Sequence, residues 1–363
     1  MNILMILSSP DKTGLTTHTV ALSGALVELG HEVTVLTAVN NPMNSEQEYF
    51  LREFKKLGVK VISYRWGKGK LSQILLTLKF LRVIGQKWDI IHAQSPYYSF
   101  MPWLLRKRFV STLHVNDLVR CFYYKNATHL IAISNETKEF AKSVFGYDEK
   151  DITIVHHGVA MRFAEEWTIE HKNKFKKEHN IPSDKLIIGL VASIEKRKGH
   201  DILLEAVWRL PKEMKDKVHI VFVGSSKDGK TNGWLAELVE KYGEGRVSLF
   251  PYQDPEVFYK IFDIFVLPSR LEGFPVVVLE AMLTGCCVVR SNVEGAYEQI
   301  DNGETGYIFE NENVGQLSEI LNEVIGNDSL RVKIAKAGKE KALSQFTSKM
   351  MAENTIKVYN KIR

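Results

Sequence analysis

Two series of short apolar segments, each alternating with helical segments, constrain the fold of this chain. The first series begins with NILMILSS, EVTVLTA and VKVISY, and each is followed by a stretch with helical spacing of apolar residues. After a polar stretch, EHKNKFKKEHNIPSDK, the alternation restarts with LIIGLVAS, HIVFVG and IFVLP. Repeated strand, helix, strand is typical of a parallel sheet covered on both faces. The sequence therefore predicts an α/β protein with two Rossmann-like domains.

The length supports two domains, because 363 residues exceed the size at which one core usually keeps growing. With 45% hydrophobic and 25% charged residues, the chain has the composition of a soluble globular protein. The longest apolar stretch, LSQILLTLKFLRVIG, is interrupted by Lys79 and Arg82 and is too short to cross a membrane. The first residues, MNILMILSSPDKTG, lack the basic start of a signal peptide and predict a first strand with its loop.

The three cysteines predict no metal site. Cys121, Cys286 and Cys287 show no metal-ligand spacing, and the last two fall in an apolar strand as small core residues. This usage fits a reducing compartment, so we expect a cytoplasmic protein.

The net charge of +5 is unevenly distributed, since Glu53 is the single acid between Arg52 and Lys87. The cations of this stretch are Lys55, Lys56, Lys60, Arg65, Lys68, Lys70, Lys79, Arg82 and Lys87. Aromatic residues are interleaved with these cations, so one hypothesis is that this part of the chain forms a face for anionic lipid headgroups. In this hypothesis the loops around Lys68, Lys70, Arg106 and Lys107 meet a membrane on its cytoplasmic side. For the helix itself we favour another interpretation, with Leu75, Leu78 and Leu81 in a buried stripe. No recognition module indicates a nucleic-acid partner.

Glu272 and Glu280 stand eight positions apart in the run SRLEGFPVVVLEAMLTG. The run passes from the strand IFVLP through Gly273 and Pro275 into a helix, which places free backbone N–H groups and a positive dipole end beside Glu272. Such a site suits a polyhydroxylated, negatively charged ligand such as a nucleotide sugar. Spacing alone leaves open that Glu272 is an ordinary first-turn helix acid and Glu280 a solvated residue.

The pattern Glu-Gly-Phe followed by Glu-Ala-Met and Gly resembles the signature of the retaining glycosyltransferases of family 4 (glycosyl transferases group 1). Gly14 and His18 after the first strand, and then IIHAQS, STLHVND, LIAIS, IVHHGV, EKRKG, VFVG and EGAYEQIDNGETGYIF, follow in family order over nearly the whole chain. The resemblance implies the GT-B fold, in which two Rossmann-like domains with parallel sheets face a central cleft. It predicts an acceptor domain over residues 1–165, a donor domain over 166–345, and a closing helix over 346–363 that returns to the first domain.

For the first domain, the resemblance implies that His114 contacts the donor sugar near its anomeric centre and acts in catalysis. Gly14 is expected to bring backbone amides close to a phosphate or a sugar, at the carboxyl edge of the sheet where ligands of such folds bind. His92 is expected to shape the site, and Gln94 replaces its usual histidine partner. A lone glycine does not make a dinucleotide fingerprint, so no nicotinamide cofactor is expected.

For the second domain, the resemblance implies that Lys198 meets the donor diphosphate and acts in catalysis. The arginine expected five residues earlier is Ser193, and we hypothesise that Arg197 or Lys196 substitutes for it. Other departures from the family are Glu294 before Gly295, where paired glycines are usual, and His157, where asparagine is common.

The double-glutamate run is expected to hold the sugar and the ribose. Glu272, with Gly273 and the backbone N–H groups of Phe274 and Val276, would bind donor-sugar hydroxyls, while Pro275 offers no N–H. Glu280 would bind both ribose hydroxyls. The segment 249–252, ending at Tyr252, would read the base, and a UDP-sugar is the favoured donor.

The predicted function is retaining transfer of a sugar from a nucleoside-diphosphate sugar to a glycan or lipid-linked acceptor. Neither a metal nor another cofactor is expected, because no acidic pair lies where a metal would bridge the diphosphate. Two alternatives stay open: a catalytically silent nucleotide-sugar-binding partner, suggested by Ser193, and a nucleotide-sugar epimerase of the same fold.

Overall fold

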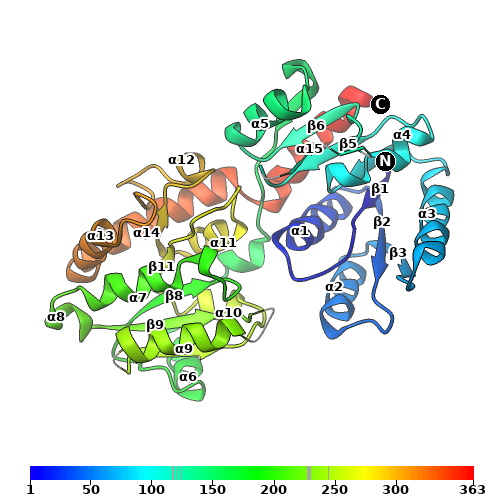
Figure 1. Ribbon diagram of the computed structural model, residues 1–363. Helices are drawn as coiled ribbons and strands as arrows, with labels where there is room; N and C mark the ends of the chain where they lie inside the picture. Colours follow the sequence, from blue (N-terminus) through cyan, green and yellow to red (C-terminus); the bar gives the residue numbers. More distant parts are fainter. Residues whose placement is uncertain (117, 120, 123, 227–229, 244) are drawn as a thin grey trace. The chain divides into compact units, whose positions relative to one another are not determined.

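The computed structural model describes residues 1–116, 118–119, 121–122, 124–226, 230–243 and 245–363. Asp117, at the end of the STLHVND segment, lies outside them. The chain divides into two compact units: Met1–Ala160 with Phe346–Arg363, and Met161–Gln345. Each unit is a parallel sheet with helices on its faces (Figure 1). The predicted pair of Rossmann-like domains is confirmed.

The first unit contains a seven-stranded sheet in the order β3-β2-β1-β4-β5-β6-β7. Its strands are β1 Asn2–Ile6, β2 Glu32–Val39, β3 Lys60–Arg65, β4 Ile90–Ala93, β5 Val110–Leu113, β6 His129–Ala132 and β7 Ile152–Ile154. Its α-helices are α1 Gly14–Glu28, α2 Ser45–Lys56, α3 Lys70–Ile84, α4 Phe100–Leu104, α5 Asn135–Phe145 and α15 Ser348–Ile362. Strand β1 is apolar on both sides because helices cover both faces of a central parallel strand.

The second unit repeats this winding in a six-stranded sheet, β10-β9-β8-β11-β12-β13. Its strands are β8 Leu186–Val191, β9 Val218–Val223, β10 Val247–Phe250, β11 Ile264–Leu267, β12 Cys287–Ser291 and β13 Tyr307–Phe309. Its α-helices are α6 Ile169–Glu178, α7 His200–Trp208, α8 Lys212–Lys215, α9 Lys230–Tyr242, α10 Glu256–Tyr259, α11 Val276–Thr284, α12 Ala296–Gln299, α13 Val314–Gly326 and α14 Asp328–Gln345. In both sheets the strand order reverses beside the first strand, at β1/β4 and at β8/β11, and ligands of such folds bind at this switch point.

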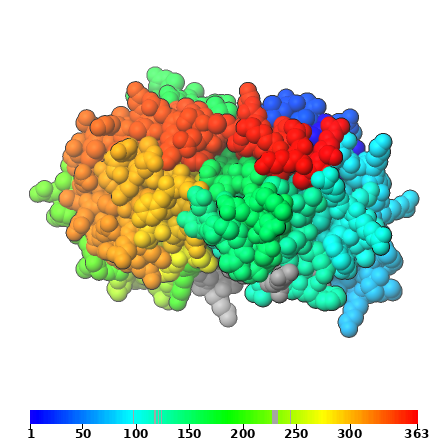
Figure 2. Space-filling model, turned by 90° about the horizontal axis from the view of Figure 1, so that it is seen from above, coloured from blue at the N-terminus to red at the C-terminus, as the bar shows by residue number. Residues whose placement is uncertain are grey.

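Helix α15 belongs to the first unit although it ends the chain. Met351, Val358 and Tyr359 are buried in the same core as Leu22 and Leu26 of α1. Figure 2 shows α15, in red, on the surface beside the blue N-terminal segment. The final segment therefore completes the core on one face of the first sheet.

The change from the first unit to the second comes after Ala160, five residues before the predicted boundary at 165. The short 3₁₀ helix η3, Met161–Ala164, packs on the second unit, where the Phe163 ring lies 5.9 Å from that of Tyr259. The Lys260 ammonium donates hydrogen bonds to the carbonyls of Arg162 and Glu165. These contacts hold residues 161–165 to the second sheet.

Helix α3 differs from the prediction. Its buried side chains are Leu76, Phe80, Val83 and Ile84, whereas Leu75 and Leu78 are 51% and 55% exposed. The predicted buried stripe was therefore wrong for these two leucines. Across the described parts of the chain, no helix is both long enough and apolar enough to span a bilayer.

Candidate active site

Four histidines gather at the carboxyl edge of the first sheet. His18 lies on α1, His92 on β4, His114 directly after β5, and His157 after β7. The Nδ1 atom of His114 lies 3.2 Å from Nε2 of His157, and the ring of His18 lies 4.8 Å from that of His114 and 4.6 Å from that of His157. Three imidazoles from distant segments therefore meet at the switch point.

Within the cluster of His18, His114 and His157, the first two imidazoles are held in the neutral state. Burial, followed by repulsion from the neighbouring imidazoles, lowers the pKa of His18 and of His114 well below the usual value. Among the described residues, neither ring nitrogen of His18 has a hydrogen-bond partner, and Nε2 of His114 has none. Buried polar atoms without partners are costly, so these nitrogens are available to a ligand or to water.

His92 lies beside the cluster and has a structural role. It is fully buried, its Nδ1 pairs with the Tyr359 hydroxyl at 2.8 Å, and its Nε2 pairs with the Thr112 hydroxyl at 2.7 Å. Burial lowers its pKa to about 3, so it stays neutral. With both nitrogens satisfied, His92 connects β4 to β5 and α15.

Gly14 begins α1 and is exposed, and a Cβ atom placed on it would meet nothing within 4 Å. Thr13 caps the helix by accepting a hydrogen bond from the Thr16 N–H. The open space beside Gly14, at the N-terminus of this 15-residue helix, suits an anion or a hydroxyl.

In the second unit, Lys198 and Glu272 form an ion pair with 2.6 Å between Nζ and Oε1. Lys198 ends the short helix η4, Lys196–Lys198, after β8, and Glu272 lies after β11, so the pair joins the two strands of the switch point. The side chains are 14% and 9% exposed. Arg197 donates a hydrogen bond to the Leu271 carbonyl and lies 3.9 Å from the second Glu272 oxygen.

Arg270 fixes these two loops to one another. Its guanidinium pairs with Asp201 and Glu312 and also donates to the Lys196 carbonyl, while its backbone N–H donates to the Arg197 carbonyl. The geometry of Lys198 and Glu272 therefore depends on a charge network formed within the unit.

The start of α11 is held by a second buried network. Arg290 is fully buried and hydrogen-bonds to Gln299 and to the carbonyls of Val293 and Glu294, and Gln299 in turn donates to the Pro275 carbonyl. Phe274 is 3% exposed at this position. The network fixes the loop that precedes α11 and, with it, the N-terminus of this helix.

Glu280 points into the interior just over one turn along α11. It is 5% exposed, and its Oε2 accepts a hydrogen bond of 2.9 Å from the Tyr259 hydroxyl. Burial raises the pKa of Glu280 to about 7, although the Tyr259 hydrogen bond opposes the shift. The open interpretation that Glu280 is a solvated residue is wrong.

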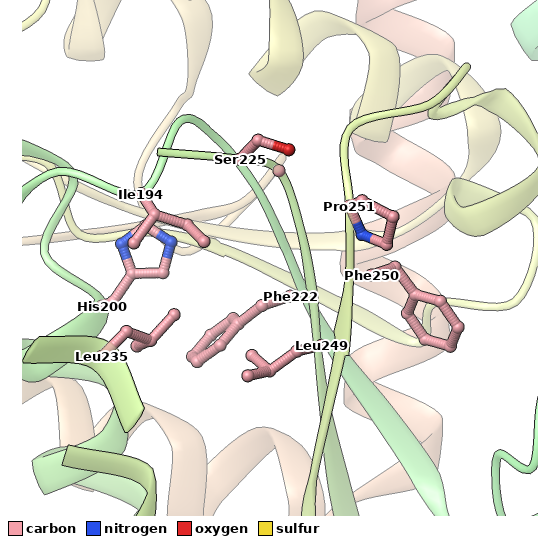
Figure 3. Close-up of a pocket in the computed structure, with 9 residues that line it drawn as sticks. Ile194, His200, Phe222, Ser225, Leu235, Leu249, Phe250 and Pro251 are labelled. Atoms are coloured by element: carbon pink, nitrogen blue, oxygen red, sulfur yellow. The ribbon is translucent and has the colours of Figure 1, made fainter. Parts of the chain in front are cut away.

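A cavity of about 250 Å³ lies past the carboxyl ends of β8, β9 and β10 (Figure 3). Its lining is apolar except for Ser225 and His200: Ile194, Phe222, Gly224, Leu235, Leu249, Phe250 and Pro251. A Cβ atom on Gly224 would lie 1.8 Å from the Ala192 carbonyl oxygen, so only glycine fits there. The Ser225 hydroxyl accepts from the Tyr252 N–H, which places the Tyr252 backbone, just after β10, beside a residue that lines the cavity.

Two family models match adjacent parts of the chain. "Glycosyltransferase Family 4" matches residues 12–163 and "Glycosyl transferases group 1" matches residues 171–341, so that together they cover both units. The chain belongs to glycosyltransferase family 4. It is a glycosyltransferase of the GT-B fold, as the sequence pattern predicted.

The relatives of this family 4 glycosyltransferase include bacterial glycosyltransferases. It is 28% identical to the capsular polysaccharide biosynthesis glycosyltransferase CapM of Staphylococcus aureus, over 64% of this chain and 62% of that protein. It is 26% identical, over 87% and 89% of the two chains, to a Campylobacter jejuni N,N'-diacetylbacillosaminyl-diphospho-undecaprenol alpha-1,3-N-acetylgalactosaminyltransferase. The crystal structure of Anabaena Alr3699/HepE with UDP and glucose matches the fold with a TM-score of 0.83, 18% identity and 99% of each chain covered.

In this transferase the structure distributes the predicted site residues over both units. Gly14 and His114 lie in the first, and the remaining ones lie in the second. Within the second unit, Arg197, Lys198 and Glu272 are in contact, and Gly273, Phe274, Pro275 and Val276 form the entry to α11. Ser193, after β8, is half-buried, and Glu280 reaches Tyr259 rather than Glu272.

Sequence reasoning did not identify the cluster of His18, His114 and His157 as a unit, nor the network around Arg290. No spacing rule links residues so far apart, and only the parallel register of the strands brings them together. Among the residues that the structure describes, this cluster is also the one group of histidine, cysteine or acidic side chains close enough to share a metal ion, with ligand atoms within 4.8 Å of one another. The expectation of no metal concerns acidic residues near the diphosphate and does not cover this cluster.

Proposed function

We propose that the protein transfers a sugar from a nucleoside-diphosphate sugar to a glycan or lipid-linked acceptor, with retention of anomeric configuration. The observation that carries the proposal is the Lys198–Glu272 pair beside the N-terminus of α11. An ammonium that suits a diphosphate, a carboxylate that suits sugar hydroxyls and a helix N-terminus lie at one edge of one sheet, and this supports the proposal.

A UDP-sugar is the proposed donor. The neighbouring HepE structures contain UDP, UDP with glucose, or UDP-glucose. The cavity lined by Leu249, Phe250 and Pro251 is apolar and lies beyond β10, where a planar base would pack. Glu280, buried on α11 beside Tyr259, is the proposed carboxylate for the ribose hydroxyls.

The acceptor is proposed from the relatives. The name of the Campylobacter jejuni relative describes transfer onto a sugar carried by diphospho-undecaprenol, and the name of CapM describes capsular polysaccharide biosynthesis. A glycan or a lipid-linked glycan is therefore the acceptor class that we propose.

In the proposed reaction, the acceptor hydroxyl attacks the anomeric carbon on the face from which the diphosphate leaves. The bond between the anomeric carbon and the phosphate oxygen breaks, and the acceptor proton passes to the departing diphosphate. Donor binding moves Lys198 from Glu272 to the diphosphate, where it stabilises the growing negative charge, and frees Glu272 for the sugar hydroxyls. The neutral imidazole of His114 hydrogen-bonds a sugar hydroxyl near the reacting carbon.

We propose that this reaction needs no metal. Lys198, with Arg197 beside it, supplies the positive charge that a divalent ion supplies to a diphosphate in other transferases. Turnover should therefore persist in chelator. Loss of turnover in chelator and its recovery with zinc would contradict this and point to the cluster of His18, His114 and His157.

Thermal unfolding with a panel of nucleoside diphosphates and their sugars tests the proposal. A ligand at about 100 times its dissociation constant stabilises a protein by roughly 2.7 kcal/mol, enough to detect. We expect a selective shift with UDP or a UDP-sugar that is lost in Glu280→Ala. The absence of a shift with every nucleotide would refute the proposed donor, and NMR of the product would report its anomeric configuration.

A further inference from the structure

Helix α3 exposes a continuous apolar stripe. Leu71, Ile74, Leu75 and Leu78 are 72%, 56%, 51% and 55% exposed, and their spacing of i, i+3, i+4 and i+7 places them on one face. Large apolar side chains are normal on a surface when they are scattered. Four on one helical face form a patch, which marks a binding surface.

The fold does not need this stripe. The opposite face of α3, with Leu76, Phe80, Val83 and Ile84, packs in the core with Leu4 and Leu36 of the sheet. In Figure 1, α3 lies at the outer side of β2 and β3, at the edge of the first unit. One apolar face of α3 therefore stabilises the domain, while the other is free to bind something outside it.

The charges around the stripe have one sign. From residue 54 to residue 88 the sequence contains no Asp or Glu. Lys70, Lys79 and Arg82 are exposed on α3 itself, and Lys68 precedes it. Long cationic side chains beside an apolar face can rest their stems on it and extend their charges to the level of lipid headgroups. The absence of acidic residues favours an anionic partner such as a lipid surface over a protein with a neutral or basic surface.

Indole rings flank the same region. Trp66, before α3, is 38% exposed, and Trp103, on the neighbouring helix α4, is 47% exposed, with the Lys125 ammonium 4.7 Å from its ring centre. The loop after α4 is joined to the end of α3, because Lys107 donates to the Gln86 carbonyl. Tryptophan is favoured at membrane interfaces, where its ring is apolar and its N–H stays hydrated.

We propose that α3 lies in the plane of an anionic lipid bilayer and inserts Leu71, Ile74, Leu75 and Leu78 below the headgroups. Lys68, Lys70, Lys79 and Arg82 then pair with lipid phosphates at the edges of the stripe. This inference goes beyond sugar transfer, since it concerns a surface of the first unit and does not depend on turnover. It gives the enzyme a bilayer surface on which a lipid-linked acceptor would be concentrated.

Vesicle sedimentation tests the proposal. The protein should pellet with vesicles of equimolar phosphatidylcholine and phosphatidylglycerol, much less with phosphatidylcholine alone, and less at high salt. In the variant Ile74→Gln/Leu75→Gln/Leu78→Gln the partition coefficient should fall at least about tenfold, because three apolar side chains no longer insert. Glutamine keeps helix propensity close to that of leucine, so the fold should persist.

The matched control is Val332→Gln/Leu343→Gln, which makes the same kind of change at exposed positions of α14 and should pellet like the wild type. Thermal stabilisation by UDP should be unchanged in both variants, which separates this proposal from that of the donor site. Wild-type protein that stays in the supernatant with anionic vesicles would overturn the proposal. So would equal pelleting of the triple variant, or a wild-type dimer that becomes a monomer in it.

Discussion

At the scale of single residues, the chemistry proposed for the second unit depends on the Lys198–Glu272 pair. Both side chains are largely buried, so removing either one leaves an unpaired charge as well as a missing ligand group. Stability and activity must therefore be separated in any test.

Lys198→Met is expected to lower kcat by about 10²–10³, because we propose that the ammonium stabilises charge that develops on the leaving diphosphate. Steady-state kinetics with the donor found in the nucleotide panel would measure the loss. The double variant Lys198→Met/Glu272→Gln removes both charges. It should regain stability in denaturant titrations and should regain no activity. Recovery of turnover in the double variant would show that Lys198 serves only to neutralise Glu272.

The buried carboxyl of Glu280 predicts a pH dependence of donor binding. Its pKa is raised to about 7, and we propose that the ribose hydroxyls donate to its ionised form. Binding of a UDP-sugar should therefore tighten roughly tenfold from pH 6 to pH 8, as the carboxyl loses its proton. Calorimetric titration at several pH values would measure this. Glu280→Gln should bind more weakly with a flat profile, and a wild-type profile without slope would contradict the proposed role.

The same shift has the opposite sign for stability. The folded-state pKa of Glu280 lies above the unfolded value, so the fold favours the protonated form. The contribution of Glu280 to stability is therefore greatest below the unfolded pKa of about 4.5, falls as the pH rises toward 7, and is lowest above it. In the free protein, ionisation of Glu280 near neutral pH therefore lowers the stability of the fold. Hydrogen bonds from a ribose diol would stabilise the ionised form.

The sequence identified most of these side chains and few of their partners. The Glu-Gly-Phe and Glu-Ala-Met pattern located Glu272 and Glu280 because their separation is local. The pairing of Glu280 with Tyr259, and the meeting of His18 with His114 and His157, depend on contacts between distant segments. A single sequence carries no spacing signal for such contacts.

At the scale of elements, the loop before α11 is shaped by close backbone packing. Gly295 has a φ of +72°, and a Cβ atom on it would lie 2.6 Å from the Gly273 carbonyl oxygen and 2.8 Å from the Phe274 ring. Only glycine satisfies both the left-handed conformation and the contact. One of the two glycines usual in the family is enough for this purpose, and Glu294 replaces the other.

Gly295→Ala is expected to destabilise the protein by more than the roughly 1–2 kcal/mol that a left-handed conformation costs a non-glycine residue, and to weaken donor binding. The matched control is Gly303→Ala, because Gly303 has a φ of +80° and nothing within 4 Å of its Cβ position. The control should show the conformational cost alone and keep wild-type donor affinity. Denaturant titration and donor binding measure the two effects, and equal losses in both variants would contradict the packing argument.

Helix α3 shows why the spacing of apolar residues predicts a helix but does not predict which face of it is buried. Apolar residues recur with helical spacing on two opposite faces of α3, one from Leu76 to Ile84 and one from Leu71 to Leu78. A spacing rule predicts the helix from either series and cannot choose between them. The side that packs is determined by the position of the sheet.

At the scale of the whole molecule, each sheet forms its own core, and the first depends on the last helix of the chain. Tyr359 of α15 is fully buried and pairs with Nδ1 of His92 on β4. The order of strands and helices was predictable from the sequence because it follows local patterns. The return of residues 346–363 to the first unit was expected from family resemblance, since local patterns do not record which core a terminal helix joins.

Tyr359→Phe tests whether the two units have separate stabilities. The substitution keeps the ring but leaves the buried His92 nitrogen without its partner, which costs about 1–3 kcal/mol. Hydrogen exchange should then quicken in β1, β4 and α1 and stay unchanged in β8 to β13, because the loss falls within one core. Ser248→Ala removes the partner of His219 in the second unit, at 2.8 Å, and should give the reverse pattern. If either variant quickened exchange in both sheets equally, the units would unfold together, and binding of a donor to the second unit would then stabilise the first as well.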